Sequence, residues 1–254
     1  MRETVVFLSN RKYLTRFADT LNQLRSNGKY AGSVLLVIGD DLLDQKSGLE
    51  SKYQIKIVHF PDITFSPEFM KYFNTLEREG HWKNKIFQYH KFYLFDPYFK
   101  TNYDKIIYID CGMHINLPIA KMFELFSAGK ILADYDYRVH PKRFHKSLES
   151  QFCKNYPEEF QALESAYDLT KWHFQTTFMI YDTKIIKDDT ASQMIELTKR
   201  YPIAMTNDQA IVALYYTVIE PCWEQIEIGD ETTYYYSYKF TDQKKPTVIS
   251  KWNR

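Results

Sequence analysis

The chain alternates between short apolar runs and longer segments with helical spacing of apolar residues. Four runs rich in β-branched residues are typical of buried strands. These are residues 4–8, 34–38, 53–60 and 105–109. Between the first two runs, residues 13–25 have apolar side chains at helical spacing and end at Asn27-Gly28, a helix stop signal. A strand–helix–strand order predicts a parallel sheet with right-handed crossovers.

The rest of the chain continues this pattern with more helical segments. Helices are predicted at residues 67–99, 116–126, 144–167, 189–200 and 208–216, and strands at 131–137 and 174–181. Thr206 or Asn207 can cap the last of these helices. A hairpin around Gly229-Asp230 is predicted next, followed by a short tail over residues 244–254. No repeat or linker divides the chain, so we expect one α/β domain over residues 1–254, with a mostly parallel central sheet flanked by helices.

A single acid follows the predicted strand of residues 105–109. Asp110 comes directly after the strand, and Cys111 and Gly112 come next. In open α/β sheets, ligands bind at the carboxyl ends of the strands. A carboxylate in that position can hold a hard divalent cation against a diphosphate. The position of Asp110 therefore predicts a binding site for a phosphorylated ligand.

Composition and charge narrow the class of protein. Hydrophobic residues make up 44% and charged residues 26% of the 254 residues, which is typical of a globular chain without disorder. The net charge is +1 and the basic residues are scattered, so no nucleic-acid partner is expected. Aromatic residues reach 17%. Most of these rings are expected in the core, and some can stack on a base or a sugar.

The cysteines and the apolar runs bear on location. Cys111, Cys153 and Cys222 have no metal-ligand spacing, and their odd, sparse number favours a reducing, cytoplasmic compartment. The longest apolar runs are too short to span a bilayer. The N-terminal run, residues 5–8, is too short for a signal peptide. We therefore expect no membrane span in this chain.

The sequence lacks the common glycine loops that bind phosphate. Glycine occurs 8 times, and neither Gly-x-Gly-x-x-Gly nor Gly-x-x-x-x-Gly-Lys-Ser/Thr is present. Dinucleotide enzymes and P-loop NTPases are therefore disfavoured. A nucleotide has to bind this chain through side chains or a metal.

Four separated segments together resemble one known family. They are residues 8–13, residues 82–92, Asp110-Cys111-Gly112, and residues 174–180 taken together with Asn207-Asp208-Gln209. In this order they are similar to the GT-A glycosyltransferases, most closely to glycosyltransferase family 8, the glycogenin-like enzymes. The resemblance implies the GT-A fold and transfer of a sugar from a nucleotide-diphosphate donor, a UDP-sugar, with retention of configuration. It also implies a divalent cation, Mn²⁺ or Mg²⁺, and a glycan, protein or small-molecule acceptor.

The first two segments imply contacts to the donor. In the family, the first segment lies along the nucleotide base, which implies that Leu8, Asn10 and Tyr13 line the base site. A Tyr face can stack on uracil while an amide reads its edge. The second segment places a cation near the donor, and both Lys85 and Lys91 match it. The structural alternatives are a cap or loop role for Asn10, a core role for Tyr13, and solvated lysines on an amphipathic helix.

The third segment carries the metal prediction. The family binds its metal through an Asp-x-Asp motif, so the resemblance assigns Asp110 to the metal and to the donor. Gly112 stands where the second Asp is expected, and the family's C-terminal His motif is absent. His114 is near enough in sequence to substitute, Cys111 is too soft for Mn²⁺ or Mg²⁺, and Lys251 can contact phosphate directly. One protein oxygen with waters, another residue, or no metal at all therefore remain open.

The fourth segment surrounds the transferred sugar and the acceptor in the family. The matching positions are Gln175, Thr176, Asp208 and Gln209, and the resemblance implies that they hydrogen-bond sugar hydroxyls. Asp208, Gln209 and Lys91 form the implied catalytic set, because a carboxylate can stabilise positive charge at the anomeric carbon. Asp208 can equally be a helix-start acid that interacts with the macrodipole. Asp134 and Asp136, at the end of another predicted strand, are further candidates.

Two other functions compete with the transferase. A sugar-1-phosphate nucleotidyltransferase has a related fold, but usually has a glycine-rich basic loop after the first strand, and Ser9-Asn10-Arg11-Lys12 lacks the glycines. A non-catalytic nucleotide-sugar-binding protein of the same fold would lack the second acid and the His motif, as this chain does. The matches around the sugar favour the transferase.

Overall fold

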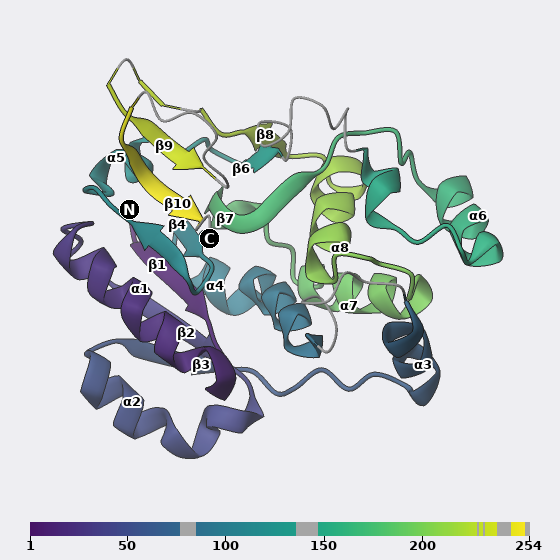
Figure 1. The fold of residues 1–254 in the computed structure, drawn as a ribbon, viewed down its shortest axis with the longest axis horizontal. Helices are drawn as coiled ribbons and strands as arrows, with labels where there is room; N and C mark the ends of the chain where they lie inside the picture. Colours follow the sequence, from purple (N-terminus) through teal and green to yellow (C-terminus); the bar gives the residue numbers. More distant parts are fainter. Residues whose placement is uncertain (77–84, 136–146, 228, 231, 238–244, 252–254) are drawn as a thin grey trace.

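The computed structural model describes residues 1–76, 85–135, 147–227, 229–230, 232–237 and 245–251. Within these residues, seven strands form a central sheet in the order β3-β2-β1-β4-β7-β6-β8 (Figure 1). The strands are β1 (Glu3–Leu8), β2 (Val34–Ile38), β3 (Lys56–His59), β4 (Lys105–Ile109), β6 (Ile131–Tyr135), β7 (Phe174–Asp182) and β8 (Trp223–Gln225). All neighbours are parallel except those that involve β7, which runs opposite to β4 and β6. The predicted α/β fold with a mostly parallel sheet is confirmed.

The apolar runs form strands because both of their faces are buried. Val5 and Phe7 of β1 point to one core, and Val6 and Leu8 point to the other. All residues of β2 and β4 are buried in the same way, and their bounds agree with the predicted 34–38 and 105–109. A strand buried on both faces needs apolar residues at successive positions, and this pattern is easily recognised in a sequence.

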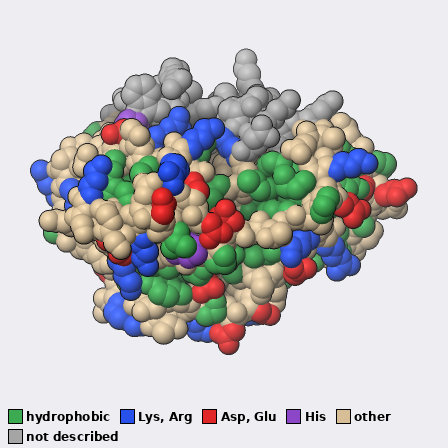
Figure 2. All heavy atoms as spheres, turned by 90° about the horizontal axis from the view of Figure 1, so that it is seen from below, with side chains coloured by type: hydrophobic (Ala, Val, Ile, Leu, Met, Phe, Trp, Pro, Cys, Tyr) green, Lys and Arg blue, Asp and Glu red, His purple; other side chains and the backbone are tan. Residues whose placement is uncertain are grey.

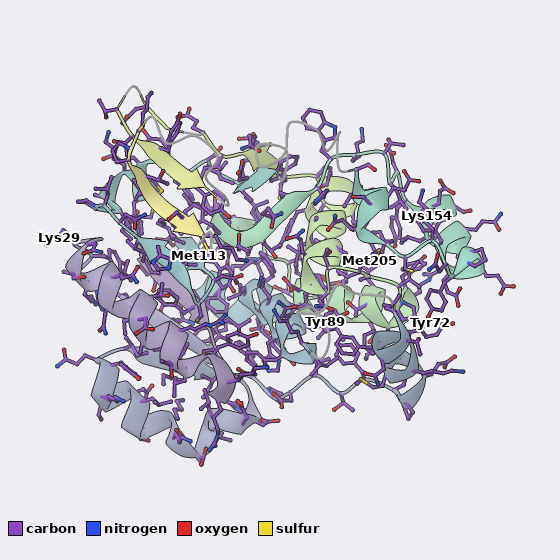
Figure 3. All side chains as sticks on the ribbon, in the orientation of Figure 1. Lys29, Tyr72, Tyr89, Met113, Lys154 and Met205 are labelled. Carbon is purple, nitrogen blue, oxygen red and sulfur yellow. The ribbon has the colours of Figure 1, made fainter. Side chains whose placement is uncertain are left out.

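Helices cover both faces of the sheet (Figure 1). One face packs against α1 (Leu14–Ser26) and α2 (Lys46–Tyr53), and the other against the 3₁₀ helix η4 (Ile86–Phe95) and α8 (Asp208–Leu214). The other helices are α3 (Pro67–Thr75), α4 (Pro97–Asn102), α5 (Ala120–Glu124), α6 (Pro157–Ala166), α7 (Thr190–Arg200), the 3₁₀ helices η1 (Arg11–Tyr13), η2 (Asp40–Gln45), η6 (Leu148–Gln151) and η7 (Thr183–Ile185), and the π-helical turn η8 (Tyr215–Ile219). Figure 3 labels Tyr89 of η4, whose buried ring packs among those of Phe65, Phe69, Phe73 and Phe92.

A second, three-stranded sheet lies over the end of β4. Its order is β5-β10-β9, formed by β5 (Met113–Ile115), β10 (Thr247–Lys251) and β9 (Tyr234–Ser237) (Figure 1). The predicted tail is therefore wrong, because its residues 247–251 form the middle strand and Val248 and Ile249 are buried. The predicted hairpin over residues 226–239 is described only in part: an antiparallel bridge links Gly229 to Tyr234, β9 then pairs with β10 in parallel, and residues 228, 231, 238 and 239 lie outside the described residues.

Several helix boundaries differ from the prediction. Tyr53 ends α2 and does not begin a strand, so β3 starts only at Lys56. Within 67–76 and 85–99 the structure has α3, η4 and the start of α4, and the possible break at Gly80 lies outside the described residues. The predicted helix of residues 116–126 shrinks to α5, and Pro157 begins α6 at its first position instead of interrupting a longer helix.

The surface mixes both signs of charge. On the face drawn in Figure 2, Lys and Arg side chains lie interspersed with Asp and Glu around exposed hydrophobic groups. This arrangement agrees with the net charge of +1 and shows no single-sign patch on that face. The thiols of Cys111, Cys153 and Cys222 are free. Across the ranges that the structure describes, no helix has both the length and the apolar character needed to cross a bilayer.

Candidate functional site

The parallel strands β1, β2 and β4 end at one edge of the sheet, and Asp110 lies at this edge. Its backbone N–H donates to the carbonyl of Thr177 on β7 (2.9 Å), and its own carbonyl accepts from the N–H of Met113 (3.2 Å). Between them the chain makes a turn at Gly112, whose φ of +91° is a conformation that favours glycine. The turn therefore leaves the Asp110 side chain at the mouth of the edge, where it is 28% exposed.

Three side chains from different elements meet below Asp110. The ammonium of Lys91, on η4, lies 3.3 Å from Oδ1 of Asp110 and 2.9 Å from Oδ2 of Asp208. It also donates to the hydroxyl of Thr176 on β7 (3.1 Å). That hydroxyl in turn donates to Oδ2 of Asp208 (2.9 Å). Two of the predicted sugar-site residues, Thr176 and Asp208, thus form one buried network with Asp110 and the predicted cation Lys91.

Tyr108 completes this network, and sequence analysis did not identify it. Its hydroxyl donates to Oδ1 of Asp110 at 2.5 Å, and its ring lies 5.3 Å from the Lys91 ammonium. Oδ1 of Asp110 is therefore shared by a hydroxyl and an ammonium. Strand alternation carried the only available signal, because Tyr108 lies two residues before Asp110 and points to the same side.

Burial and charge act in opposite directions on the titrating groups. Burial lowers the pKa of Lys91, but the nearby carboxylates of Asp110 and Asp208 outweigh it and raise that pKa above its ordinary value. Burial raises the pKa of Asp208, and Lys91 opposes this only in part. Burial and the Asp110 charge raise the pKa of Tyr108 far above 10. Lys91 is therefore a cation and Tyr108 a neutral donor at physiological pH.

The start of α8 is strained. Asn207 precedes the helix with φ 53° and ψ −121°, which is unfavourable for a side chain other than hydrogen, yet it is fully buried. It makes no side-chain cap, so the predicted capping role is wrong; instead Nδ2 donates to Oε1 of Gln88 at 2.5 Å. Its Oδ1 has no hydrogen-bond partner within the described residues. This geometry brings Asp208 to Lys91 and Gln209 to the amide of Gln151 (3.1 Å).

The predicted base-site residues lie on the other side of the turn. Asn10 caps η1, because its Oδ1 accepts from the N–H of Tyr13 (3.2 Å). The structural alternative, a cap role, is therefore confirmed. The amide nitrogen of Asn10 takes no part in that bond. Tyr13 is half-buried and carries the guanidinium of Arg16 5.4 Å above its ring. Leu8 is buried, and its carbonyl accepts from the Cys111 thiol at 3.1 Å.

The other predicted residues lie on elements around the network. Gln175 is buried on β7, but alternation turns its side chain away from Thr176. Lys85 precedes η4, and Lys251 ends β10, opposite Met113. Figure 3 labels Met113, the first residue of β5 in the small sheet. Asp134 is buried and accepts from the amide of Gln225 (2.7 Å). Asp136 lies outside the described residues.

The described residues around Asp110 offer few ligands for the expected divalent cation. Such an ion needs about six oxygen ligands, of which a protein usually supplies at least one or two carboxylates. Here Oδ1 of Asp110 is shared by Lys91 and Tyr108, and Gly112 offers no side chain. No group of three His, Cys, Asp or Glu side chains able to hold a metal occurs in the described part of the chain. The metal role of Asp110 stays a prediction.

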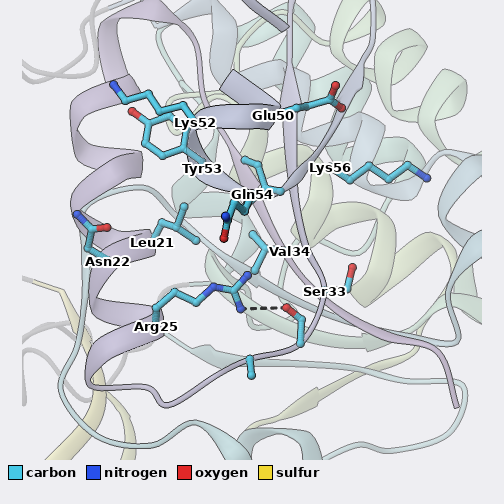
Figure 4. Close-up of a pocket in the computed structure, with 13 residues that line it drawn as sticks. Leu21, Asn22, Arg25, Ser33, Val34, Glu50, Lys52, Tyr53, Gln54 and Lys56 are labelled. Carbon is cyan, nitrogen blue, oxygen red and sulfur yellow. Dashed lines mark hydrogen bonds between the residues drawn. The ribbon is translucent and has the colours of Figure 1, made fainter. Parts of the chain in front are cut away.

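A cavity of about 860 Å³ lies at the opposite edge of the sheet. Figure 4 shows it between α1, the end of α2 and the first residues of β2 and β3, with Arg25, Glu50 and Tyr53 among its lining. The Arg25 guanidinium donates there to the carbonyl of Gly32 (2.9 Å). This is the amino edge of the parallel strands. Because ligands of open α/β sheets bind at the carboxyl edge, and because the buried charges gather there, the residues around Asp110 are the candidate functional site.

The comparisons with known proteins agree on the fold. No protein-family model and no curated sequence matches the chain. Among solved structures, an active-site mutant of LgtC is similar over 98% of this chain and 86% of its own, with a TM-score of 0.59 and 12% identity. The glycosyltransferase GlyE of Streptococcus pneumoniae TIGR4 is similar over 89% of this chain, with a TM-score of 0.50 and 14% identity; its apo form gives 0.53 and 13%. The chain has the GT-A glycosyltransferase fold.

The chain spans 45% of the length of GlyE. The low sequence identity limits what the likeness shows to the fold. Activity, donor and acceptor therefore have to be argued from the residues of this chain.

Proposed function

We propose that this protein is a glycosyltransferase of the family 8 type that transfers a sugar from a nucleotide-diphosphate donor, a UDP-sugar, to an acceptor hydroxyl. The observation that carries the proposal is the buried Lys91 ammonium, held between Asp110 and Asp208 at the carboxyl edge of a GT-A sheet. A buried lysine between two carboxylates costs folding free energy, because three charges lose their hydration. Such an arrangement is typical of functional sites.

The roles follow from exposure. Asp110 is the exposed member of the network, so it meets the donor, while Tyr108 and Lys91 fix its orientation. Asp208 is buried; it positions Lys91 through Oδ2. Gln209 is half-buried beside it. Its amide nitrogen donates to Gln151, so its carbonyl oxygen can accept a hydrogen bond from a sugar hydroxyl.

The chemistry requires the bond between the anomeric carbon and the diphosphate to break while the acceptor oxygen attacks that carbon and its proton passes to the departing diphosphate. Negative charge then develops on the diphosphate and positive charge on the sugar ring. A preorganised ammonium beside a carboxylate can stabilise both charges, since neither group has to reorient during the reaction. Retention of configuration at the anomeric carbon is part of the proposal. Donor base contacts are assigned to Asn10 and Tyr13.

A thermal-shift screen of nucleotide diphosphates and nucleotide sugars, with and without Mn²⁺, tests the proposal. We expect one nucleoside diphosphate and its sugar conjugate to raise the melting temperature, because a ligand that binds only the native state stabilises it. Release of the nucleotide in the presence of acceptors then shows transfer, and NMR of the product anomer shows retention. If no nucleotide or nucleotide sugar stabilises the protein, the proposal is wrong.

A non-catalytic nucleotide-sugar-binding protein is the second candidate, because Gly112 removes one expected acid and Oδ1 of Asp110 is already shared. The same assay separates the two functions. Binding of a nucleotide sugar without its turnover in any acceptor mixture would favour the second candidate.

A further inference from the structure

The buried network at Asp110 does not by itself attract a diphosphate. The carboxylates of Asp110 and Asp208 carry two negative charges, and Lys91 carries one positive charge, so one negative charge is left over. A diphosphate is also an anion, and like charges a few ångströms apart repel. A donor bound beside Asp110 therefore needs a further cation at the turn.

Arg16 of α1 lies beside this turn. Its neighbour one helical turn along the same face, Thr20, accepts a hydrogen bond from the N–H of Gly112 (3.0 Å), so this face of α1 is fixed against the turn. A Cβ atom built on Gly112 would meet one heavy atom within 4 Å, Cδ of Arg16 at 3.5 Å. The Arg16 side chain therefore lies next to the position that the Cβ atom of the motif's second Asp would occupy.

The Arg16 guanidinium is free to bind an anion. The other N-terminal arginines are engaged: Arg2 pairs with Asp104, Arg11 pairs with Asp44, and Arg25 donates to backbone carbonyls. Arg16 is exposed, and among the residues that the structure describes its guanidinium has neither a carboxylate nor a carbonyl partner. The Tyr13 ring lies 5.4 Å from its guanidinium carbon. Stacking on a ring holds a guanidinium in place and leaves its N–H groups available.

The backbone at Gly112 shows that the departure from the motif involves more than one missing side chain. At φ +91° an aspartate would be strained, so an acid cannot be restored there without a change in the turn. The turn thus presents a glycine with open space and an arginine, where a metal site would present a second carboxylate.

We propose that Arg16 binds the diphosphate of the donor nucleotide across the Asp110-Cys111-Gly112 turn, in place of a metal ion held by two acids. The inference rests on the proposed function, since it concerns the same donor. The planar guanidinium can donate two parallel hydrogen bonds to phosphate oxygens, a geometry that a lysine cannot reproduce. Tyr13 then supports Arg16 with one ring face and offers the other to the base.

Isothermal titration calorimetry tests this assignment. UDP, ADP and GDP are titrated into the wild-type protein in EDTA, and the tightest of them is compared with its monophosphate in wild type, Arg16→Met, Arg16→Lys and Lys12→Met. Lys12→Met tests whether any exposed cation of the same segment matters, because its loss changes the net charge equally. Arg16→Met should weaken the diphosphate by about 10- to 100-fold, as expected for lost charge-assisted hydrogen bonds. Arg16→Lys should recover only part of this loss, and Lys12→Met should stay within about twofold.

The outcomes separate the inference from the proposed function. If a diphosphate binds in EDTA and Arg16→Met binds it as tightly as wild type does, Arg16 has no such role, while the donor site itself stands. If wild type binds the diphosphate only after Mn²⁺ or Mg²⁺ is added, a metal does the work assigned here to Arg16, and the inference is wrong. If no nucleoside diphosphate binds under either condition, the proposed function fails first.

Discussion

Two buried lysines lie at opposite ends of strand β4, and their surroundings differ. Lys105 begins the strand; it pairs with Glu3 (3.2 Å), donates to the carbonyl of Phe123, and lies over the Phe126 ring (4.6 Å). Its one carboxylate partner balances its charge. Lys91 lies at the carboxyl end of β4, between the carboxylates of Asp110 and Asp208. The side chain of Asp110 is partly exposed to solvent.

The comparison shows how a structural lysine differs from a functional one. A lysine with a single acid and aromatic rings forms a neutral set, although Glu3 is partly exposed. The set around Lys91 keeps one excess negative charge, and it lies at the edge where α/β sheets bind ligands. Burial alone would not have separated the two residues, because both are almost fully buried.

Replacing each lysine with methionine gives the largest contrast. Lys91→Met leaves the buried Asp208 without its cation, so we expect a loss of about 3–5 kcal/mol in unfolding free energy. Transfer should fall by about 100-fold or more in the fraction that folds, because a preorganised charge is lost. Urea denaturation and initial rates measure the two effects.

Lys105→Met is the control for this experiment. Its partner Glu3 is partly exposed and can regain water, so the expected loss of stability is about 1–2 kcal/mol. Transfer by the folded protein should not change. Equal loss of activity in both variants would show that the distinction between the two ends of β4 is wrong.

Asp208→Asn sharpens the comparison on the acid side. The amide keeps the shape of the side chain but removes the charge that holds Lys91 at 2.9 Å. Lys91 retains Asp110, so stability should fall by only about 1–3 kcal/mol. We expect kcat to fall by about 10- to 100-fold while nucleotide affinity changes little, since Asp208 is buried below the donor. Unchanged kcat would remove Asp208 from the mechanism.

Asn207→Gly tests whether strain at the start of α8 serves the site. Glycine adopts φ 53° and ψ −121° without strain, which stabilises the protein, whereas loss of the hydrogen bond to Gln88 destabilises it. We expect a net rise of about 0.5–1 kcal/mol in the unfolding free energy. Activity should nevertheless fall, because the strain positions Asp208. Gln54→Gly is the matched control: Gln54 also has φ 53°, but lies exposed after α2 at the amino edge. It should stabilise the protein without changing activity.

Substitution of His90 gives the smallest expected change in stability. His90 precedes Lys91 in the sequence, but its side chain faces Asp62 in the loop after β3. Burial lowers its pKa below 6.5, although Asp62 (3.3 Å) and Asp40 act in the opposite direction. Neutral His90 therefore contributes stability above pH 6.5 that is lost as the pH falls through the lowered pKa. Between about pH 8 and about pH 5, wild type should lose more stability than His90→Phe. Identical pH profiles by thermal melts would contradict this assignment.

The sequence predicts the parallel core well because those strands are buried on both faces. It predicts the individual members of the site, Asp110, Lys91, Thr176 and Asp208, through family resemblance. Their assembly around one ammonium depends on β7 and α8 packing against η4, and no local pattern encodes such contacts between distant segments. The sequence does not identify Arg16 for a related reason. On α1 it is one polar residue on an exposed helix face, and only the turn at Gly112 makes it a neighbour of Asp110.

A crystal structure of the protein with its bound nucleoside diphosphate tests the central claim most directly. The account predicts that the diphosphate lies over the Asp110-Cys111-Gly112 turn, next to the Arg16 guanidinium and above the Lys91 network. A nucleotide bound instead in the cavity at the amino ends of β2 and β3 would contradict it.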